Sequence, residues 1–205
     1  MNIEYDIDLL KHEIKNPLLI CNGYLDMIMN KNIETKRTYL EIIKQEINRT
    51  LQIVENVKSK KEIFDLTLLF EDIEETLKDL LKEADCDIYY KENEEIYLEG
   101  NYNQLKQAFI NIIKNSLEAK KDDNLKINIK VSSLKNYYKI IIEDNGLGMT
   151  NSELNHIYNE YYTTKKNGTG LGIPFIKKVI DNHNGKISYK SIKNVGTTVT
   201  IYLAK

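Results

Sequence analysis

DNGLGM, at residues 144–149, and YYTTKKNGTGLG, at residues 161–172, together carry five of the nine glycines in this chain of 205 residues. Glycine concentrates where the backbone needs a positive φ or where a ligand lies against the main chain. Each stretch alone would be read as an ordinary turn. The two together, separated by a polar segment at residues 151–160 that predicts a short helix, indicate a ligand site.

The residues beside these glycines indicate which kind of ligand to expect. Gly170, Leu171 and Gly172 precede the apolar helical run IPFIKKVI, so loop amides and a helix N-terminus converge on one point. Such a point attracts phosphate. Asp144 closes a run of β-branched residues, which places its carboxylate at the end of a strand, facing the same pocket.

The two stretches resemble the G1 and G2 boxes of the GHKL nucleotide-binding fold, which is shared by histidine kinases, gyrase-like ATPases and anti-sigma kinases. The resemblance implies that Asp144 accepts a hydrogen bond from the adenine amino group of ATP. It also implies that a mobile lid closes on the phosphates. The nucleotide-binding residues implied in these stretches are Asp144, Gly146, Gly148, Gly168, Thr169, Gly170, Leu171 and Gly172.

Two further motifs extend the resemblance. EYYTTK resembles the F-box of the fold, with Tyr161 and Tyr162 where phenylalanine is usual, so Tyr162 is implied in the nucleotide site. Lys165 and Lys166 either meet the γ-phosphate or are solvated residues of the lid, and we favour a phosphate contact for Lys165. A glycine-threonine pair near the C-terminus resembles the short G3 motif and adds Thr197 to the site.

A strong helix is predicted from residue 105 to residue 120, and Asn111 and Asn115 lie one turn apart on it. Surface asparagines are ordinary in such an asparagine-rich chain. In context, however, FINIIKNSLEA resembles the N-box, whose second asparagine ligates the Mg²⁺ that bridges the ATP phosphates. Asn115 takes that role, and Ser116 is a minor departure from the commoner alanine. Asn111 stands where GHKL ATPases and serine kinases carry a general base, and an amide has no useful basicity, so it favours a histidine kinase.

The first sixty residues predict a helical hairpin. Apolar residues recur at three- and four-residue steps from residue 5 to about residue 30, and again from residue 40 to residue 57. One hairpin cannot bury the whole of this seam. We therefore expect two copies of the chain to form a dimeric four-helix bundle.

His12 lies roughly opposite the seam and is expected to face solvent, as an ordinary polar residue would. Pro17 follows inside the same helix, where it removes a backbone hydrogen bond and tends to kink the axis. HEIKNPL, at residues 12–18, resembles the H-box of histidine kinases. The resemblance implies that His12 is phosphorylated on Nε2, that Glu13 orients its ring, and that Asn16 positions a water for dephosphorylation.

Composition excludes several other classes of protein. A net charge of -2 and a pI near 6.0 show no basic excess, so nucleic acid is not an expected partner. No apolar run approaches the roughly 20 residues that span a bilayer and no signal peptide is evident, so we expect a cytoplasmic chain.

Cys21 and Cys86 lack metal-site spacing and are expected to be reduced. His183 ends the helix after Gly172 and is expected to act as a C-terminal capping cation.

These patterns predict an α+β chain with two domains: a dimerisation and phosphotransfer hairpin at residues 1–60, and a GHKL, or Bergerat, α/β sandwich with a mixed sheet at residues 61–205. The resemblance implies that ATP and Mg²⁺ support autophosphorylation of His12. The phosphoryl group would then pass to an aspartate of a response-regulator receiver domain, and phosphatase activity is a further expectation.

Alternatives stay open at this point. One is a non-catalytic phosphotransfer or scaffold dimer, and another is a GHKL serine kinase or ATPase. Transfer within or between protomers depends on the loop between the two helices. Only eleven residues precede His12, so the chain is either an excised core or a kinase without a sensor.

Overall fold

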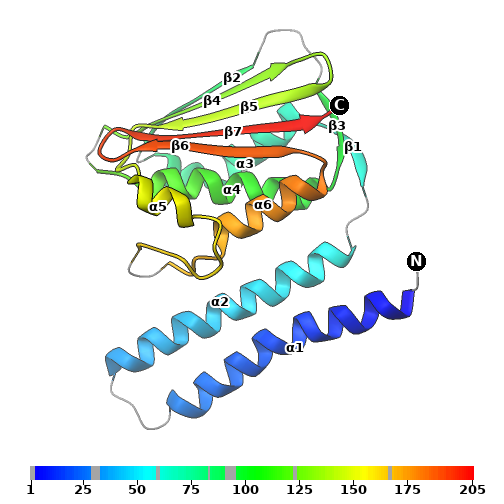
Figure 1. Cartoon of the computed structure of the whole chain (residues 1–205), viewed down its shortest axis with the longest axis vertical. Coiled ribbons are helices and arrows are strands. Elements are labelled where there is room, and N and C mark those ends of the chain that lie inside the picture. Colours follow the sequence, from blue (N-terminus) through cyan, green and yellow to red (C-terminus); the bar gives the residue numbers. More distant parts are fainter. Residues whose placement is uncertain are drawn as a thin grey trace. The chain divides into compact units, whose positions relative to one another are not determined.

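The computed structural model of the chain describes residues 3–28, 33–58, 61–82, 84–90, 96–121, 124–165 and 168–205. The chain divides into two compact units, Met1–Ser59 and Lys60–Lys205, which Figure 1 shows as a pair of helices and as a layered α/β structure. None of the helices within the described ranges combines the length and the apolar character that crossing a bilayer requires. The loop between the two helices, at residues 29–32, lies outside those ranges.

The first unit is a hairpin of two helices, α1 (Ile3–Ile28) and α2 (Ile33–Lys58), as the apolar spacing predicts. Cys21 of α1 and Ile43 of α2 are buried between them. The Cys21 thiol donates a hydrogen bond to the Ile43 carbonyl, with 3.6 Å between sulfur and oxygen. The rings of Tyr24 and Tyr39 also meet across the hairpin, with 5.0 Å between their centroids. The contact between the helices is therefore made by side chains of the predicted seam and by their aromatic neighbours.

Much of the seam stays uncovered in a single chain. Leu18, Leu25, Leu40 and Ile47 all belong to it, and the least exposed of the four is still 44% exposed. Burying apolar surface contributes about 25 cal/mol per Å², and these side chains gain little of that in a lone hairpin. The dimeric four-helix bundle stays a prediction that this exposure supports.

The second unit is built on a five-stranded mixed sheet. Its strands lie in the order β2 (Asp85–Tyr90), β4 (Lys126–Ser133), β5 (Tyr137–Asp144), β7 (Gly196–Ala204) and β6 (Lys186–Ile192). β2 runs parallel to β4, and the other neighbouring pairs are antiparallel. A separate antiparallel pair joins β1 (Glu62–Asp65) to β3 (Tyr97–Gly100).

Three helices cover one face of this sheet (Figure 1): α3 (Leu66–Leu81), α4 (Tyr102–Glu118) and α6 (Gly172–Asn182). Their apolar stripes meet the inward-facing residues of the strands in one core. Phe70 and Phe109 lie at its centre, with 4.8 Å between their ring centroids. α4 begins after Asn101, whose side chain accepts a hydrogen bond from the Gln104 N–H at 3.0 Å. This is the predicted α/β sandwich with a mixed sheet.

α5 (Asn151–His156) is shorter than the predicted segment of residues 151–160. A capping box fixes its start: the Thr150 hydroxyl accepts from the Glu153 N–H at 3.2 Å, and the Glu153 carboxylate accepts from the Thr150 N–H at 2.7 Å. α5 ends at His156, whose carbonyl accepts from the Asn159 N–H in a tight turn at 2.9 Å. Further on, Tyr161 adopts a φ of 65° and its N–H donates to the Gly170 carbonyl. The turn at Asn159 therefore ends the helix before residue 160, where the predicted segment ended.

His183 corrects one expectation from the sequence. It stands at the C-terminus of α6 as predicted, but it is buried and neutral rather than an exposed cation. Its Nε2 accepts a hydrogen bond from the Asn101 N–H at 2.9 Å, so its ring proton lies on Nδ1, which donates to the Val179 carbonyl at 2.7 Å. Burial lowers the pKa of His183. The side chain thus joins the end of α6 to the start of α4.

Candidate functional site

Three donors hold the carboxylate of Asp144 at the end of β5. Its Oδ1 accepts from the Gly146 N–H at 3.0 Å and from the Thr197 N–H at 3.2 Å. Its Oδ2 accepts from the Ser116 hydroxyl at 2.9 Å. Burial raises the pKa of Asp144, and the three hydrogen bonds offset part of that rise. The carboxylate is therefore fixed in direction, and Oδ2 keeps a second lone pair for a further donor.

Three glycines next to Asp144 allow neighbouring backbone segments to approach one another closely. Gly196 has a φ of 144°, and a Cβ there would lie 1.9 Å from the Asp144 carbonyl oxygen, so only glycine lets β7 start so close to β5. Gly146 lies against Ala119 at the end of α4, and Gly148 lies against the turn between β6 and β7. The predicted G1 glycines therefore lie where α4, β5 and the last hairpin meet.

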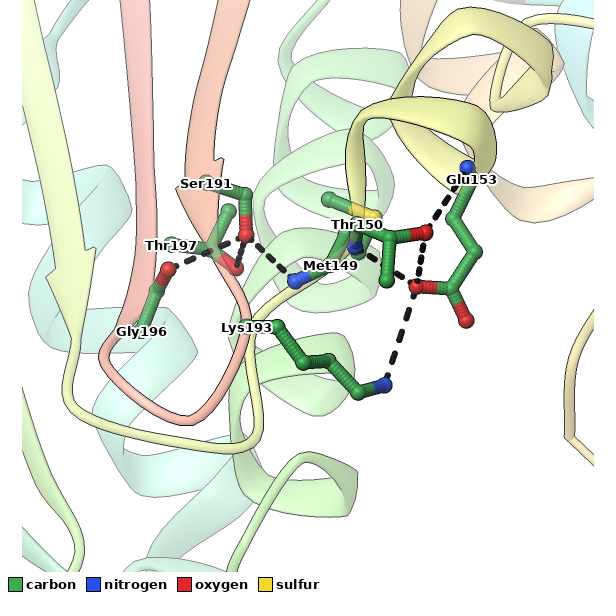
Figure 2. A network of polar contacts seen from close by, with 7 residues as sticks. All are labelled: Met149, Thr150, Glu153, Ser191, Lys193, Gly196 and Thr197. Atoms are coloured by element: carbon green, nitrogen blue, oxygen red, sulfur yellow. Dashed lines mark hydrogen bonds and ion pairs between the residues drawn. The ribbon is translucent and has the colours of Figure 1, made fainter.

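A chain of polar contacts ties the segment after β5 to the β6–β7 hairpin, as Figure 2 shows. The Ser191 hydroxyl accepts from the Met149 N–H at 2.7 Å and donates to the Gly196 carbonyl at 3.0 Å. It also lies 2.9 Å from the Thr197 hydroxyl. Thr197 thus has its side chain in this network and its N–H on Asp144, so the network also keeps the Thr197 donor in place.

Ser116 has a part in the site that the sequence did not indicate. It was expected only as a minor departure from alanine, yet it is 3% exposed and donates to Asp144. Its position beside Asn115, on the buried face of α4, was the available signal. Its acceptor lies 28 residues further along the chain, so the contact could not be read from local spacing.

The segment of residues 161–172, which we name the lid segment, is closed through Gly170. The Tyr161 N–H donates to the Gly170 carbonyl at 3.1 Å. Gly170 has a φ of 68°, and a Cβ there would lie 2.3 Å from the Tyr161 carbonyl carbon, so the two ends of the segment can meet only at a glycine. The Tyr162 ring packs on His156 of α5, with 5.4 Å between their centroids. The aromatic position of the F-box therefore packs against α5.

The lid segment ends at the N-terminus of α6. The Thr169 hydroxyl accepts from the Leu171 N–H at 3.2 Å, and the Gly168 N–H donates to the Lys165 carbonyl at 3.2 Å. α6 begins at Gly172 without a side-chain cap. A helix start that lacks such a cap leaves backbone donors for an anion. This is the end of the segment at which the sequence predicts phosphate; Lys166 lies outside the described residues.

The Lys165 ammonium rests on the predicted Mg²⁺ ligand. Its Nζ lies 2.8 Å from Asn115 Oδ1 and 2.5 Å from Glu118 Oε2. Asn115 and Glu118 are three residues apart on α4, so both oxygens project from one face of the helix. Glu118 is a second residue that the sequence did not single out, because its partner is 47 residues away.

The donor set at this point fits Mg²⁺. The amide oxygen of Asn115 already accepts from a cation, and Mg²⁺ prefers oxygen ligands. Within the described ranges no group of three or more His, Cys, Asp or Glu side chains could hold a metal by itself. A few protein oxygens suffice, since Mg²⁺ is commonly completed by substrate phosphates and water.

Asn111 lies one turn before Asn115 on α4 and is half-buried. Its Oδ1 accepts a hydrogen bond from the Gln107 amide at 3.4 Å. Both members of this pair are amides, so the position offers no group that could deprotonate water or a hydroxyl.

The H-box residues lie in the other unit, on α1. His12 and Asn16 are exposed, and α1 continues through Pro17, which is buried. The side chain of Glu13 lies outside the described part of the structure. The predicted site residues therefore form two sets, one around Asp144 and Asn115 and one along the exposed side of α1.

Comparison with known families gives two matches along the chain. Residues 100–205 match the family described as histidine kinase-, DNA gyrase B-, and HSP90-like ATPase. Residues 8–62 match the His Kinase A (phospho-acceptor) domain. The first range contains Asp144 and Asn115, and the second contains His12.

Individual relatives agree with these matches. Sporulation kinase B of Bacillus subtilis is 31% identical over 202 residues, which cover 94% of this chain and 47% of that protein. Sporulation kinase A of the same organism is 31% identical over 208 residues, which cover 96% of this chain and 34% of that protein. The chain thus spans about half the length, or less, of these curated relatives.

Solved structures show the same architecture. The catalytic domain of histidine kinase ThkA matches with a TM-score of 0.63 and 25% identity, over 71% of this chain and 96% of that chain. Histidine kinase ThkA in complex with response regulator protein TrrA matches with a TM-score of 0.61 and 24% identity, over 98% of this chain and 61% of that chain.

Proposed function

Since the chain belongs to the family of histidine kinase-, DNA gyrase B- and HSP90-like ATPases, and is a two-component histidine kinase catalytic core, we propose that it uses ATP to phosphorylate its own His12. The observation that carries the proposal is the anchored carboxylate of Asp144 in one unit together with an exposed H-box histidine in the other. One unit is suited to hold the nucleotide, and the other presents a nucleophile to solvent. We take the hairpin domain as residues 1–60 and the ATP-binding domain as residues 61–205.

The nucleotide is held by residues whose positions follow from the fold. The free lone pair of Asp144 Oδ2 accepts from the adenine amino group, and the hydrogen bond from Ser116 keeps that oxygen in place. The backbone donors at the start of α6 meet the phosphates. Asn115 is the protein ligand for Mg²⁺, which when bound neutralises charge on the phosphates.

The chemical step needs no general base from the protein. The Nε2 lone pair of neutral His12 attacks the γ-phosphorus of ATP, a P–N bond forms, the bond to the β-phosphate oxygen breaks, and ADP leaves. The ring proton stays on Nδ1, and Glu13 is our candidate for the residue that orients the ring. Because Asn111 and its partner Gln107 are both amides, the site is suited to a nucleophile that does not have to lose a proton before it attacks.

The phosphoryl group then passes to a carboxylate. An aspartate oxygen of a receiver domain attacks phosphorus, the P–N bond breaks, and His12 returns to its neutral form. Such a partner is suggested by the matching structure of ThkA in complex with response regulator protein TrrA. Asn16 is exposed one turn after His12 on α1, and we propose that it orients the water that removes the phosphoryl group from that partner. Because these reactions use ATP and a receiver domain, we propose that they take place in the cytoplasm.

The hairpin would act as a dimer in this scheme. Four residues of its seam, Leu18, Leu25, Leu40 and Ile47, are exposed in a single chain. A second hairpin would cover them in a four-helix bundle and would leave His12, on the opposite side of α1, open to the ATP-binding domain and to the receiver.

The proposal is tested by His12→Gln. We expect this variant to bind ATP as the wild type does but to incorporate no phosphate from γ-labelled ATP, because the glutamine amide has no nucleophilic lone pair. Lys44→Gln is the control: that residue is also exposed in the hairpin, lies outside the H-box, and its loss should leave labelling in place. Retained labelling in the His12 variant would overturn the assignment.

A further inference from the structure

The contact between the lid segment and α4 is made by a cation at the place predicted for a metal. The Lys165 ammonium is held by Asn115 Oδ1 at 2.8 Å and by Glu118 Oε2 at 2.5 Å. The backbone behind it is also held, since the Lys165 N–H donates to the Thr163 hydroxyl at 3.1 Å and the Gly168 N–H donates to the Lys165 carbonyl at 3.2 Å. The backbone amide and the carbonyl of Lys165 are therefore both held where its ammonium meets α4.

The charges of Lys165 and Glu118 determine how a second cation would interact with Asn115. An ammonium in contact with Asn115 Oδ1 repels any other cation that approaches this oxygen. Glu118 supplies the negative charge that keeps the ammonium there. The side chains of Lys165 and Glu118 are 40% and 58% exposed, so the pair is weak enough to exchange its partners.

We propose that Lys165 and Mg²⁺ compete for the oxygen of Asn115, and that Glu118 is the positioning residue that holds the Lys165 ammonium there. Binding of the metal–nucleotide then releases Lys165 from α4. The inference rests on the proposed function in one respect, which is the role of Asn115 as the Mg²⁺ ligand. It adds a role for Glu118 and a reason why the lid segment changes its contacts when nucleotide binds.

The exchange links metal binding to the position of the lid segment. Without nucleotide, Lys165 fastens the segment to α4 and also occupies the metal ligand. With Mg²⁺ on Asn115, the ammonium leaves that oxygen and becomes available to the phosphates. Lys165 thus serves two sites in turn, which reconciles its observed contact with the phosphate contact that the sequence predicts.

The test measures ADP binding by calorimetry at increasing Mg²⁺ concentrations. ADP is the probe because it has no γ-phosphate, so a loss of the predicted contact between Lys165 and that phosphate does not affect the result. Lys165→Met removes the competing charge at nearly constant length. ADP affinity increases with Mg²⁺, and the midpoint of this increase defines a Mg²⁺ concentration. We expect Lys165→Met to lower that concentration about three-fold, the size expected for an exposed ion pair.

Two further variants separate competition from other effects. Lys114→Met removes the same charge from an exposed position beside Asn115 on α4, and we expect no more than a small change from it. Glu118→Gln should lower the Mg²⁺ requirement as Lys165→Met does, because the ammonium loses its anchor. An increase with Glu118→Gln would mean that Glu118 itself binds the metal, and equal effects of Lys165→Met and Lys114→Met would mean a general charge effect. Either result overturns the proposal.

A second measurement is independent of nucleotide. With neither ADP nor Mg²⁺ present, Lys165→Met and Glu118→Gln should both speed amide hydrogen exchange at Tyr161 and Tyr162, since each variant frees the lid segment from α4. Unchanged hydrogen exchange in both variants would overturn the proposed role of Lys165 and Glu118 in holding the lid segment on α4. These readouts involve no phosphoryl transfer, so failure of His12 to become labelled would not affect them.

Discussion

Replacing His183 by leucine tests how the ATP-binding unit is held together behind its site. Leucine fills a similar volume but cannot accept the hydrogen bond that the Asn101 N–H donates to Nε2 at 2.9 Å. Asn101 is buried, so that donor loses its acceptor, at a cost of about 1–3 kcal/mol. The second lost bond costs little, because the Val179 carbonyl still accepts from the N–H of residue 183. We therefore expect the free energy of unfolding to fall by about 2 kcal/mol.

Hydrogen exchange of the central strands β4 and β5 measures this loss in the intact chain. A decrease of about 2 kcal/mol corresponds to roughly a 30-fold fall in protection at pH 8. Burial lowers the pKa of His183, so its contribution is complete above its unfolded pKa of about 6.5 and decreases as the pH falls toward the folded value. The difference between wild type and variant should therefore shrink below about pH 6.5. Equal protection at pH 8, or a difference that stays constant down to pH 5, would refute this account of His183.

The other predictions concern the nucleotide site and the hairpin. Ser116→Ala should weaken ADP binding about five-fold, the equivalent of one hydrogen bond. The variant also removes a donor that lowers the pKa of Asp144, so as the pH is lowered its ADP affinity should begin to fall at a higher pH than that of the wild type. An unchanged pH profile would count against the contact. Gly170→Ala should cost about ten-fold in ADP affinity from backbone strain. Gly23→Ala on α1, whose Cβ would meet nothing within 4 Å, should leave that affinity unchanged; equal behaviour of the two would disprove the close approach to Tyr161. Asn16→Ala should slow dephosphorylation of a phosphorylated receiver domain severalfold without affecting ATP binding, and an unaltered rate would remove Asn16 from that role.

Local patterns were sufficient to predict most of the fold. The three- and four-residue apolar steps of α1 and α2 reflect one buried stripe on each helix, and the β-branched run before Asp144 reflects a strand that is buried on one face. Clustered glycines marked the segments where backbones approach one another closely, as at Gly170. Each of these signals is carried by residues near one another in the sequence, which is why they could be read without the structure.

The contacts that arrange the site were not visible in this way, because they join distant segments. The rule that cations favour a helix C-terminus predicted a charged His183, but its partner Asn101 lies 82 residues away, and burial there excludes the charge. Lys165 was predicted to meet phosphate, and the structure places it on Glu118, 47 residues earlier. The end of α5 was missed for a different reason: the turn in which the Asn159 N–H donates to the His156 carbonyl contains no glycine or proline.

The central claim, that the chain transfers phosphate from ATP to His12, is tested most directly by the chemistry of the labelled protein. The purified chain is incubated with Mg²⁺ and γ-labelled ATP, and the labelled product is then treated with acid and with base. A phosphoramidate on histidine is lost in acid and survives base, and we predict this behaviour for the wild type, with no label in His12→Gln. Label that survives acid would indicate a phosphate ester on a hydroxyl side chain, and tight ATP binding without any label would indicate a non-catalytic dimer; either result would contradict the account.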